Sequence, residues 1–268
     1  MPEATTASID QAFSSARAEG RAALMPYLMG GFPDQETATA VATAYVDAGA
    51  DLIELGVPFS DPLADGPTIH AADTAALAAG ATLDSVLETC AAVAGRVPVA
   101  LMVYANMVLA TGGSEFAHRA AAAGAAGVIV PDLPLEERGP IADALDGRSL
   151  ALIPLVAPTT PPERRAEICA AARGFVYLVS TVGVTGERAD LPGELSELIS
   201  AAKREADVPV AVGFGISTPE QAATVGAKAD GVIVGTRLVR EVAEARDRDA
   251  AVRGVSDFLR AARDALYR

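Results

Sequence analysis

The stretch Ala48-Gly-Ala-Asp-Leu-Ile-Glu-Leu-Gly-Val-Pro-Phe-Ser-Asp-Pro-Leu-Ala-Asp65 is the most informative part of the chain about its fold. It leaves an alanine-rich helical segment through a glycine, which suits the left-handed position just after a helix end. It then enters the short apolar run 51–55 and continues into a proline-rich loop. Continuously apolar runs of this length are typical of parallel strands that are covered on both faces. The stretch therefore predicts a helix end, a buried strand and a loop in succession.

The same passage from a glycine-terminated helix into a strand recurs along the chain. It is found in Ala123-Gly-Ala-Ala-Gly-Val-Ile129 and in Val225-Gly-Ala-Lys-Ala-Asp-Gly-Val-Ile233. In all, eight apolar runs are predicted to be strands: 22–29, 51–55, 97–103, 127–130, 150–155, 174–179, 209–213 and 230–234. They alternate with segments of helical periodicity such as 34–48, 68–79, 113–123, 161–172 and 217–226.

Eight alternating strands and helices favour an α/β fold of the (β/α)8 or TIM-barrel type over a doubly wound open sheet. An open sheet of that kind usually begins with a Gly-rich dinucleotide-binding turn, and no GxGxxG follows the first strand here. We predict an additional N-terminal helix at 8–19 that plugs the barrel floor, and a longer amphipathic helix at 250–266. A barrel typically takes about 250 residues, so we expect residues 1–268 to form a single (β/α)8-barrel domain.

The charge and composition of the chain indicate which kinds of partner it can bind and in which cellular compartment it works. The net charge of −14 repels phosphate backbones, which makes nucleic acid an unfavourable partner but leaves room for a small phosphorylated ligand. Residues 1–10 lack the features of a signal peptide, and the longest uncharged apolar run, 120–131, is too short to span a bilayer. Cys90 and Cys169 lie far apart and are most simply buried apolar residues. We therefore expect a soluble, cytoplasmic protein.

Glu54 lies at the carboxyl end of the strand 51–55, which is where the chemistry of a barrel is located. A carboxylate inside an apolar strand is costly unless it is paired or neutralised, and residues 22–95 contain no Lys or Arg. Burial should raise the pKa of Glu54, which suits a group that must donate and accept a proton near neutral pH. Glu54 is therefore a predicted catalytic residue.

Asp61 and Asp65 follow in the loop after this strand. The prolines Pro58, Pro62 and Pro67 prevent the loop from being helical, so it could fold back over the barrel mouth. On residue type alone Asp61 is better explained as a turn or cap residue. Asp65 fits a structural and a catalytic role equally well.

Two later strands end in glycine turns that lead into helices, Gly213-Phe-Gly-Ile-Ser217 and Gly235-Thr236. After the seventh and eighth strands of a barrel, such turns often bind phosphate through backbone N–H groups and a helix N-terminus. They could also be no more than tight turns. The segment 180–190 has the length, glycines and hydroxyls of a lid that closes over substrate, although an ordinary surface loop would have the same composition. The two histidines, His70 and His118, form no metal-ligand or nucleophilic cluster, so no metal site is predicted.

These residues resemble the tryptophan synthase alpha chain family over essentially the whole chain. The most specific match is Leu52-Ile-Glu-Leu-Gly-Val-Pro-Phe-Ser-Asp-Pro-Leu-Ala-Asp-Gly-Pro-Thr68. Supporting matches, in family order, are Tyr104-Ala-Asn106, Pro131-Asp-Leu-Pro134, Gly183-Val-Thr-Gly186, Gly213-Phe-Gly-Ile216 and Gly235-Thr236. The resemblance implies a carbon–carbon lyase of tryptophan biosynthesis that cleaves indole-3-glycerol phosphate to indole and D-glyceraldehyde 3-phosphate by retro-aldol chemistry.

The resemblance also implies a role for each site residue. Glu54 would shuttle protons at the indole C3 and the glycerol hydroxyl, and Asp65 would bind the indole N–H and stabilise the developing iminium-like charge. The indole pocket and its lid would be formed by Tyr27, Met102, Ile129, Tyr177 and Thr185. The phosphate would be bound by Gly186, Gly213, Phe214, Gly215, Gly235 and Thr236. Pro58 and Asp61 would belong to a loop that contacts a partner subunit.

That partner would be the tryptophan synthase beta chain in an α2β2 tetramer. The beta chain would receive the indole and condense it with serine on pyridoxal phosphate, while this chain would itself hold no cofactor. Two other readings stay open at this point. One is a different phosphate-binding barrel enzyme, and the other is a catalytically silent subunit that only activates the beta chain. The presence of both Glu54 and Asp65 argues against each of them.

Overall fold

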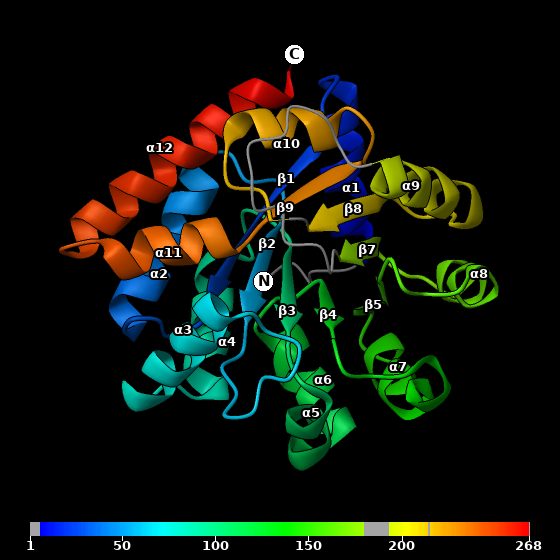
Figure 1. Ribbon diagram of the computed structural model, residues 1–268. Helices are drawn as coiled ribbons and strands as arrows, with labels where there is room; N and C mark the ends of the chain where they lie inside the picture. Colours follow the sequence, from blue (N-terminus) through cyan, green and yellow to red (C-terminus); the bar gives the residue numbers. More distant parts are fainter. Residues whose placement is uncertain (1–5, 180–192, 214, 268) are drawn as a thin grey trace.

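The strands form one parallel sheet that curves into a nearly closed barrel in a computed structural model, which describes residues 6–179, 193–213 and 215–267. Figure 1 shows the strands at the centre and the helices around them. The order of the strands in the sheet is β5-β4-β3-β2-β1-β9-β8-β7-β6. Their bounds are β1 Ala23–Met29, β2 Ile53–Gly56, β3 Val99–Met102, β4 Gly127–Ile129, β5 Ala151–Ile153, β6 Leu155–Val156, β7 Val176–Val179, β8 Val210–Gly213 and β9 Gly231–Val234.

The first and last strands in this order, β5 and β6, are two halves of one predicted strand. They are separated by Pro154 alone, and proline has no N–H with which to continue the ladder. Its carbonyl still takes part, because the backbone N–H of Tyr177 donates to the Pro154 oxygen at 3.0 Å. β5 pairs with β4 and β6 pairs with β7, so the interrupted strand joins the two sides of the sheet. The predicted TIM-barrel fold with eight strand positions is confirmed.

Helices follow the strands along the chain, and no single helix in the described ranges is long and apolar enough to cross a membrane. Helices α3 and α4 together have the length and apolar composition of a membrane span, but the pair is bent by 107° at the break between them. The helices are α1 Thr6–Ala18, α2 Gln35–Asp47, α3 Pro67–Ala78, α4 Leu83–Val93, α5 Ala105–Thr111, α6 Gly113–Ala122, η1 Leu135–Glu137, α7 Gly139–Asp146, α8 Pro162–Ala170, α9 Gly193–Glu205, α10 Pro219–Gly226, α11 Thr236–Glu244 and α12 Arg248–Leu266.

The barrel interior is filled by side chains, and helix α1 contributes to the filling from below. Ile9 and Phe13 of α1 belong to the same buried cluster as Met25, Ile153 and Phe175. The rings of Phe13 and Phe175 lie 5.7 Å apart. The predicted N-terminal helix therefore plugs the barrel floor as expected. A second, larger cluster lies between the outer face of the strands and the surrounding helices.

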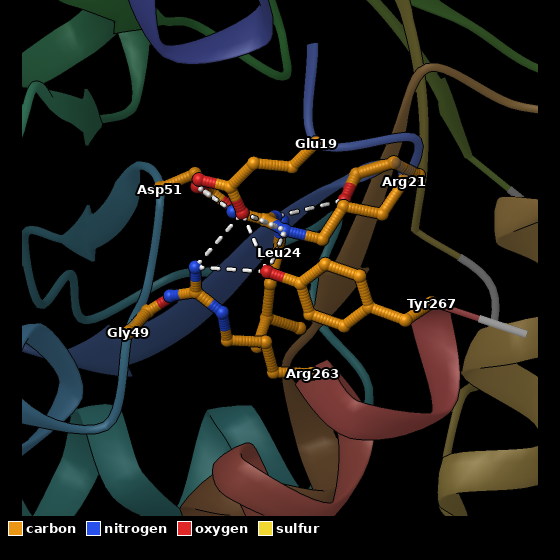
Figure 2. Close-up of polar contacts among 8 residues, drawn as sticks. Glu19, Arg21, Leu24, Gly49, Asp51, Arg263 and Tyr267 are labelled. Carbon is orange, nitrogen blue, oxygen red and sulfur yellow. Dashed lines mark hydrogen bonds and ion pairs between the residues drawn. The ribbon is translucent and has the colours of Figure 1, made fainter. Parts of the chain in front are cut away.

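A polar network at the amino ends of β1 and β2 fastens the C-terminal helix to the barrel (Figure 2). The fully buried guanidinium of Arg21 donates to both oxygens of Asp51, at 2.5 and 2.8 Å. Asp51 also accepts the backbone N–H of Leu24 at 2.7 Å. On its other side Arg21 donates to Glu19 and to the hydroxyl of Tyr267, just beyond the end of α12. This end of a barrel is where residues contribute to stability rather than chemistry.

Candidate active site

A cavity of about 540 Å³ opens at the carboxyl ends of the strands, large enough for a small organic ligand. Its walls combine strand ends with the loops and helices that follow them. They comprise Tyr27, Glu54, Ala64, Asp65, Ile69, Met102, Pro131, Leu155, Tyr177, Val179, Gly213, Gly215, Ile216, Ser217, Ile233, Gly235, Thr236, Arg237 and Arg240. Most of the predicted site residues that the structure describes are therefore gathered around one cavity.

Glu54 lies in the wall of this cavity on β2, between Tyr27 of β1 and Ala100 of β3 in the sheet register. It is 1% exposed, and its Oε1 atom is buried without a hydrogen-bond partner among the described residues. Burial and, to a smaller extent, the negative charge of Asp65 together raise the pKa of Glu54 to about 8. A carboxyl group in this state can exchange a proton near neutral pH.

Asp65 reaches the same cavity from the loop 57–66. The Tyr104 hydroxyl donates to its Oδ2 atom at 2.8 Å, and the backbone N–H of Ala64 donates to the Tyr104 oxygen at 3.0 Å. Burial raises the pKa of Asp65, whereas the Tyr104 hydrogen bond and the nearby His70 act to lower it. Glu54 can therefore be protonated near neutral pH, and Asp65 places a second carboxyl group in the same cavity.

Tyr27, Met102 and Tyr177 line an apolar side of the cavity, and both tyrosines are buried. Glycine is needed beside each ring. A Cβ atom on Gly56 would lie 2.2 Å from the Tyr27 hydroxyl, and one on Gly213 would lie 2.5 Å from the Tyr177 hydroxyl. The two glycines let the tyrosine side chains approach the backbone of the neighbouring strands closely.

Ile129 differs from the expectation that it would line the indole pocket. It is fully buried in the interior cluster that also contains Tyr177, and it is not among the residues of the cavity wall. The reason is its position in β4, where its side chain points into the packed barrel interior.

The predicted phosphate end of the cavity is formed by backbone at two neighbouring strand ends. Gly213, Gly215, Gly235 and Thr236 all line the wall. Gly215 has a φ of +47°, in the left-handed region that favours glycine. Helix α11 begins at Thr236, so its first N–H groups and the positive end of its dipole face this region.

Two arginines of α11 also line this end of the cavity. Arg237 is engaged elsewhere, because it pairs with Glu241 and lies over the Phe258 ring with 5.2 Å to the centroid. Arg240 is exposed. The predicted ligand contacts Thr185, Gly186 and Phe214, and the predicted lid 180–190, lie outside the described residues.

The loop that carries Asp65 also contains the predicted interface residues. Pro58 is buried, whereas Asp61 is exposed and accepts a hydrogen bond from Ser60 at 2.6 Å. Between them and Asp65, Leu63 is 92% exposed. This side of the loop is open to a partner.

Sequence reasoning missed the roles of Tyr104 and Asp73. Tyr104 was part of a matched motif, but nothing in its local sequence indicates that its hydroxyl accepts the Ala64 N–H and donates to the Asp65 carboxylate. The position of Asp73 could have been recognised from the sequence pattern. It lies on the buried face of α3, at helical spacing from Ile69 and Ala76. An acid on the apolar face of a helix in a segment without Lys or Arg points to a special environment. Among the described residues no group of three or more His, Cys, Asp or Glu side chains could hold a metal ion.

Comparison with known proteins gives a consistent result. The family model "Tryptophan synthase alpha chain" matches residues 13–265. The tryptophan synthase alpha chain of Prochlorococcus marinus (strain MIT 9313) is 49% identical over 244 residues, which cover 90% of this chain and 89% of that relative. The same subunit of Synechococcus elongatus (strain ATCC 33912 / PCC 7942 / FACHB-805) is 45% identical over 97% of both chains.

Solved structures agree with these relatives. A structure of Mycobacterium tuberculosis tryptophan synthase matches with a TM-score of 0.90 and 39% identity, covering 97% of this chain and 98% of that chain. The tryptophan synthase alpha chain of Legionella pneumophila subsp. pneumophila matches with a TM-score of 0.87 and 35% identity over 97% of both chains. The (β/α)8 fold, the two carboxyl groups that share one cavity and these matches lead to one conclusion: the chain belongs to the tryptophan synthase alpha chain family.

Proposed function

We propose that this chain cleaves indole-3-glycerol phosphate to indole and D-glyceraldehyde 3-phosphate, with Glu54 and Asp65 as its catalytic carboxyl groups. The observation that carries the proposal is the buried, unpartnered Oε1 atom of Glu54 in a cavity that Asp65 shares. Such an atom is costly to bury unless a ligand group completes its hydrogen bonding. The membership in a lyase family supports the same reaction.

The chemistry requires a proton to be delivered and another to be removed. Protonated Glu54 donates its proton to the indole C3, which places positive charge on the ring nitrogen. Ionised Asp65 accepts the ring N–H and stabilises that charge. The carboxylate of Glu54 then takes the proton of the glycerol hydroxyl as the carbon–carbon bond breaks. The bonding electrons return to the indole ring, the hydroxyl carbon becomes an aldehyde, and Glu54 is protonated again.

Substrate orientation would come from the two ends of the cavity. The rings of Tyr27 and Tyr177 and the side chain of Met102 offer an apolar wall for the indole. Backbone N–H groups at Gly215, Gly235 and Thr236, with the dipole of α11, suit the phosphate. Holding both ends converts the proton transfers into reactions between prepositioned groups, which is a large source of rate acceleration.

The family name implies a beta chain as the partner of this chain. We propose an α2β2 tetramer in which the beta chain receives the indole and holds the pyridoxal phosphate. The exposed side of the loop 57–66, with Asp61 and Leu63, would be part of the contact. This chain would bind no cofactor of its own and would act in the cytoplasm.

A steady-state assay of indole release by the purified chain, alone and with a beta chain, tests the reaction directly. We expect measurable indole release by the isolated chain and faster release in the complex. A second barrel reaction, or a purely regulatory role, would instead give no indole above the level of a Glu54→Gln variant under either condition.

The pH dependence of kcat/KM provides a second test. Because the first step uses protonated Glu54, and burial raises the pKa of that group to about 8, kcat/KM should fall as the pH rises through about 8. On the acid side kcat/KM should fall as Asp65 takes up a proton, at a pH above the ordinary pKa of an aspartate. A kcat/KM that rises through pH 8 and stays high would contradict the role of Glu54 as the initial acid.

A further inference from the structure

We infer that Asp73 of α3 is a positioning residue that holds the catalytic loop 57–66 through the backbone of Phe59. This inference rests on the proposed role of Asp65, which the same loop carries. Asp73 is 14 residues from Phe59 in sequence, and its Oδ1 atom accepts the Phe59 N–H at 3.1 Å. The bond ties the start of the loop to helix α3, and α3 is itself packed against α11 and β1.

The surroundings of Asp73 show that it is not an ordinary surface acid. It is 1% exposed, and its Oδ2 atom is buried without a hydrogen-bond partner among the described residues. Neighbours on α3 that share its face, Ile69, Ala72 and Ala76, pack with Tyr27 and Val239 in an apolar cluster. An apolar side chain would be the stable choice at such a position, and a carboxyl group there lowers stability unless it has a role.

The described groups near Asp73 leave its hydrogen bond to Phe59 as the contact through which it acts. In the part of the chain that the structure describes, the titratable groups that interact electrostatically with Asp73 are the acid Asp65 and the hydroxyls of Tyr27 and Tyr104. None of them is a cation that would pair with an ionised Asp73. Burial raises the pKa of Asp73, the hydrogen bond from the Phe59 N–H acts to lower it, and the negative charge of Asp65 acts to raise it, which leaves the pKa at about 7.

Asp73 and Tyr104 together hold the loop at its two ends. Asp73 fixes Phe59 near the start, and the Tyr104 hydroxyl fixes Ala64 and Asp65 near the end. The Phe59 ring also packs on the Tyr104 ring, with 5.1 Å between centroids. Loss of the Asp73 hydrogen bond would therefore loosen the Phe59–Tyr104 contact and, through it, the position of the Asp65 carboxylate.

The test compares Asp73→Ala and Asp73→Leu, which remove the acceptor, with Asp73→Asn, which keeps it. For indole release we expect both apolar variants to lower kcat by about 10- to 100-fold, because displacing a catalytic group by about 1 Å can cost 10²-fold. KM should stay within about threefold, since the proposed phosphate contacts are on other elements. Asp73→Asn should keep kcat within about threefold of the wild type, because its side-chain oxygen can still accept the Phe59 N–H.

The matched control is Thr74→Ala. Thr74 is the next residue of α3, it is exposed, and its hydroxyl donates to the His70 carbonyl oxygen at 3.0 Å. Wild-type kcat in this variant, with reduced kcat in both apolar variants, supports the inference. Unchanged kcat in Asp73→Ala and Asp73→Leu overturns it, and so does an Asp73→Asn variant as slow as the apolar ones.

Amide hydrogen exchange keeps the inference testable if the apolar variants do not fold or if the substrate is a different one. In the wild-type protein the Phe59 N–H should exchange at least about tenfold more slowly than the Ser60 N–H, after correction for intrinsic rates. Equal exchange at the two amides overturns the inference. Failure of the wild-type chain to release indole would instead overturn the proposed function and leave the exchange result intact.

Discussion

Glu54→Gln is expected to lower kcat for indole release by about 10³-fold or more, because a glutamine amide can neither donate a proton to carbon nor take one from a hydroxyl. The substitution keeps the shape of a side chain that is 1% exposed. It removes a carboxyl group that lines the cavity and whose buried Oε1 atom has no hydrogen-bond partner among the described residues. Steady-state indole release by the purified variant, alone and with a beta chain, is the measurement.

Two controls separate loss of chemistry from loss of structure. Affinity for indole-3-glycerol phosphate should remain within about threefold of the wild type, because the proposed contacts to the phosphate are on other strands. The variant should also be folded. Turnover within tenfold of the wild type would remove Glu54 from the mechanism, whereas weak binding would point to a role in holding the substrate.

The stability of the same variant should depend on pH in a defined direction. In the folded protein Glu54 keeps its proton up to about pH 8, whereas in the unfolded chain it loses it near pH 4.5. Between these values the unfolded state binds fewer protons, so the wild type loses stability as the pH rises. Glu54→Gln lacks this penalty. Its stability relative to the wild type should therefore grow between about pH 4.5 and pH 8, by about 1.4 kcal/mol for each pH unit.

Much of the fold could be predicted from the sequence because local signals and the global fold agree. The continuous apolar runs end where strands end, and Glu54 could be singled out because a carboxylate within such a run has few physical explanations. The fifth strand shows the limit of this reasoning. Its apolar pattern continues through Pro154, whereas the hydrogen bonds of the sheet divide it into two short strands, β5 and β6.

The parts of the site that could not be predicted depend on contacts between distant segments. Asp65 could be assigned no role from the residues alone, because its hydrogen bond comes from Tyr104, 39 residues away. Ile129 was placed in the ligand pocket by family resemblance, yet its depth in the barrel depends on how every strand is staggered. Periodicity shows which face of a strand is buried, but it does not show at which level of the barrel a side chain lies.

The second large effect is expected at the opposite end of the barrel, where Asp51→Ala should destabilise the protein by about 3 kcal/mol. The substitution leaves the Arg21 guanidinium, 1% exposed, without its bidentate partner, and breaking one side of a buried ion pair costs about 3–5 kcal/mol. The lower figure is expected because Arg21 still donates to Glu19 and Tyr267. Thermal and denaturant unfolding would measure the loss, and kcat of the folded variant should be unchanged.

Asp230→Ala is the matched control, because Asp230 precedes β9 as Asp51 precedes β2 and likewise accepts a backbone N–H, that of Val210, at 3.0 Å. Its cations, Arg17 and Lys203, are 72% and 39% exposed, so losing the pair should cost about 1 kcal/mol or less beyond the backbone bond. Equal destabilisation by the two variants would show that the buried charge of Arg21 is not the cause.

The double variant Arg21→Met/Asp51→Leu tests the same cause by removing the ion pair as a whole. It removes both charges, so it should recover part of the stability that Asp51→Ala loses, because a buried pair can often be exchanged for apolar side chains at little cost.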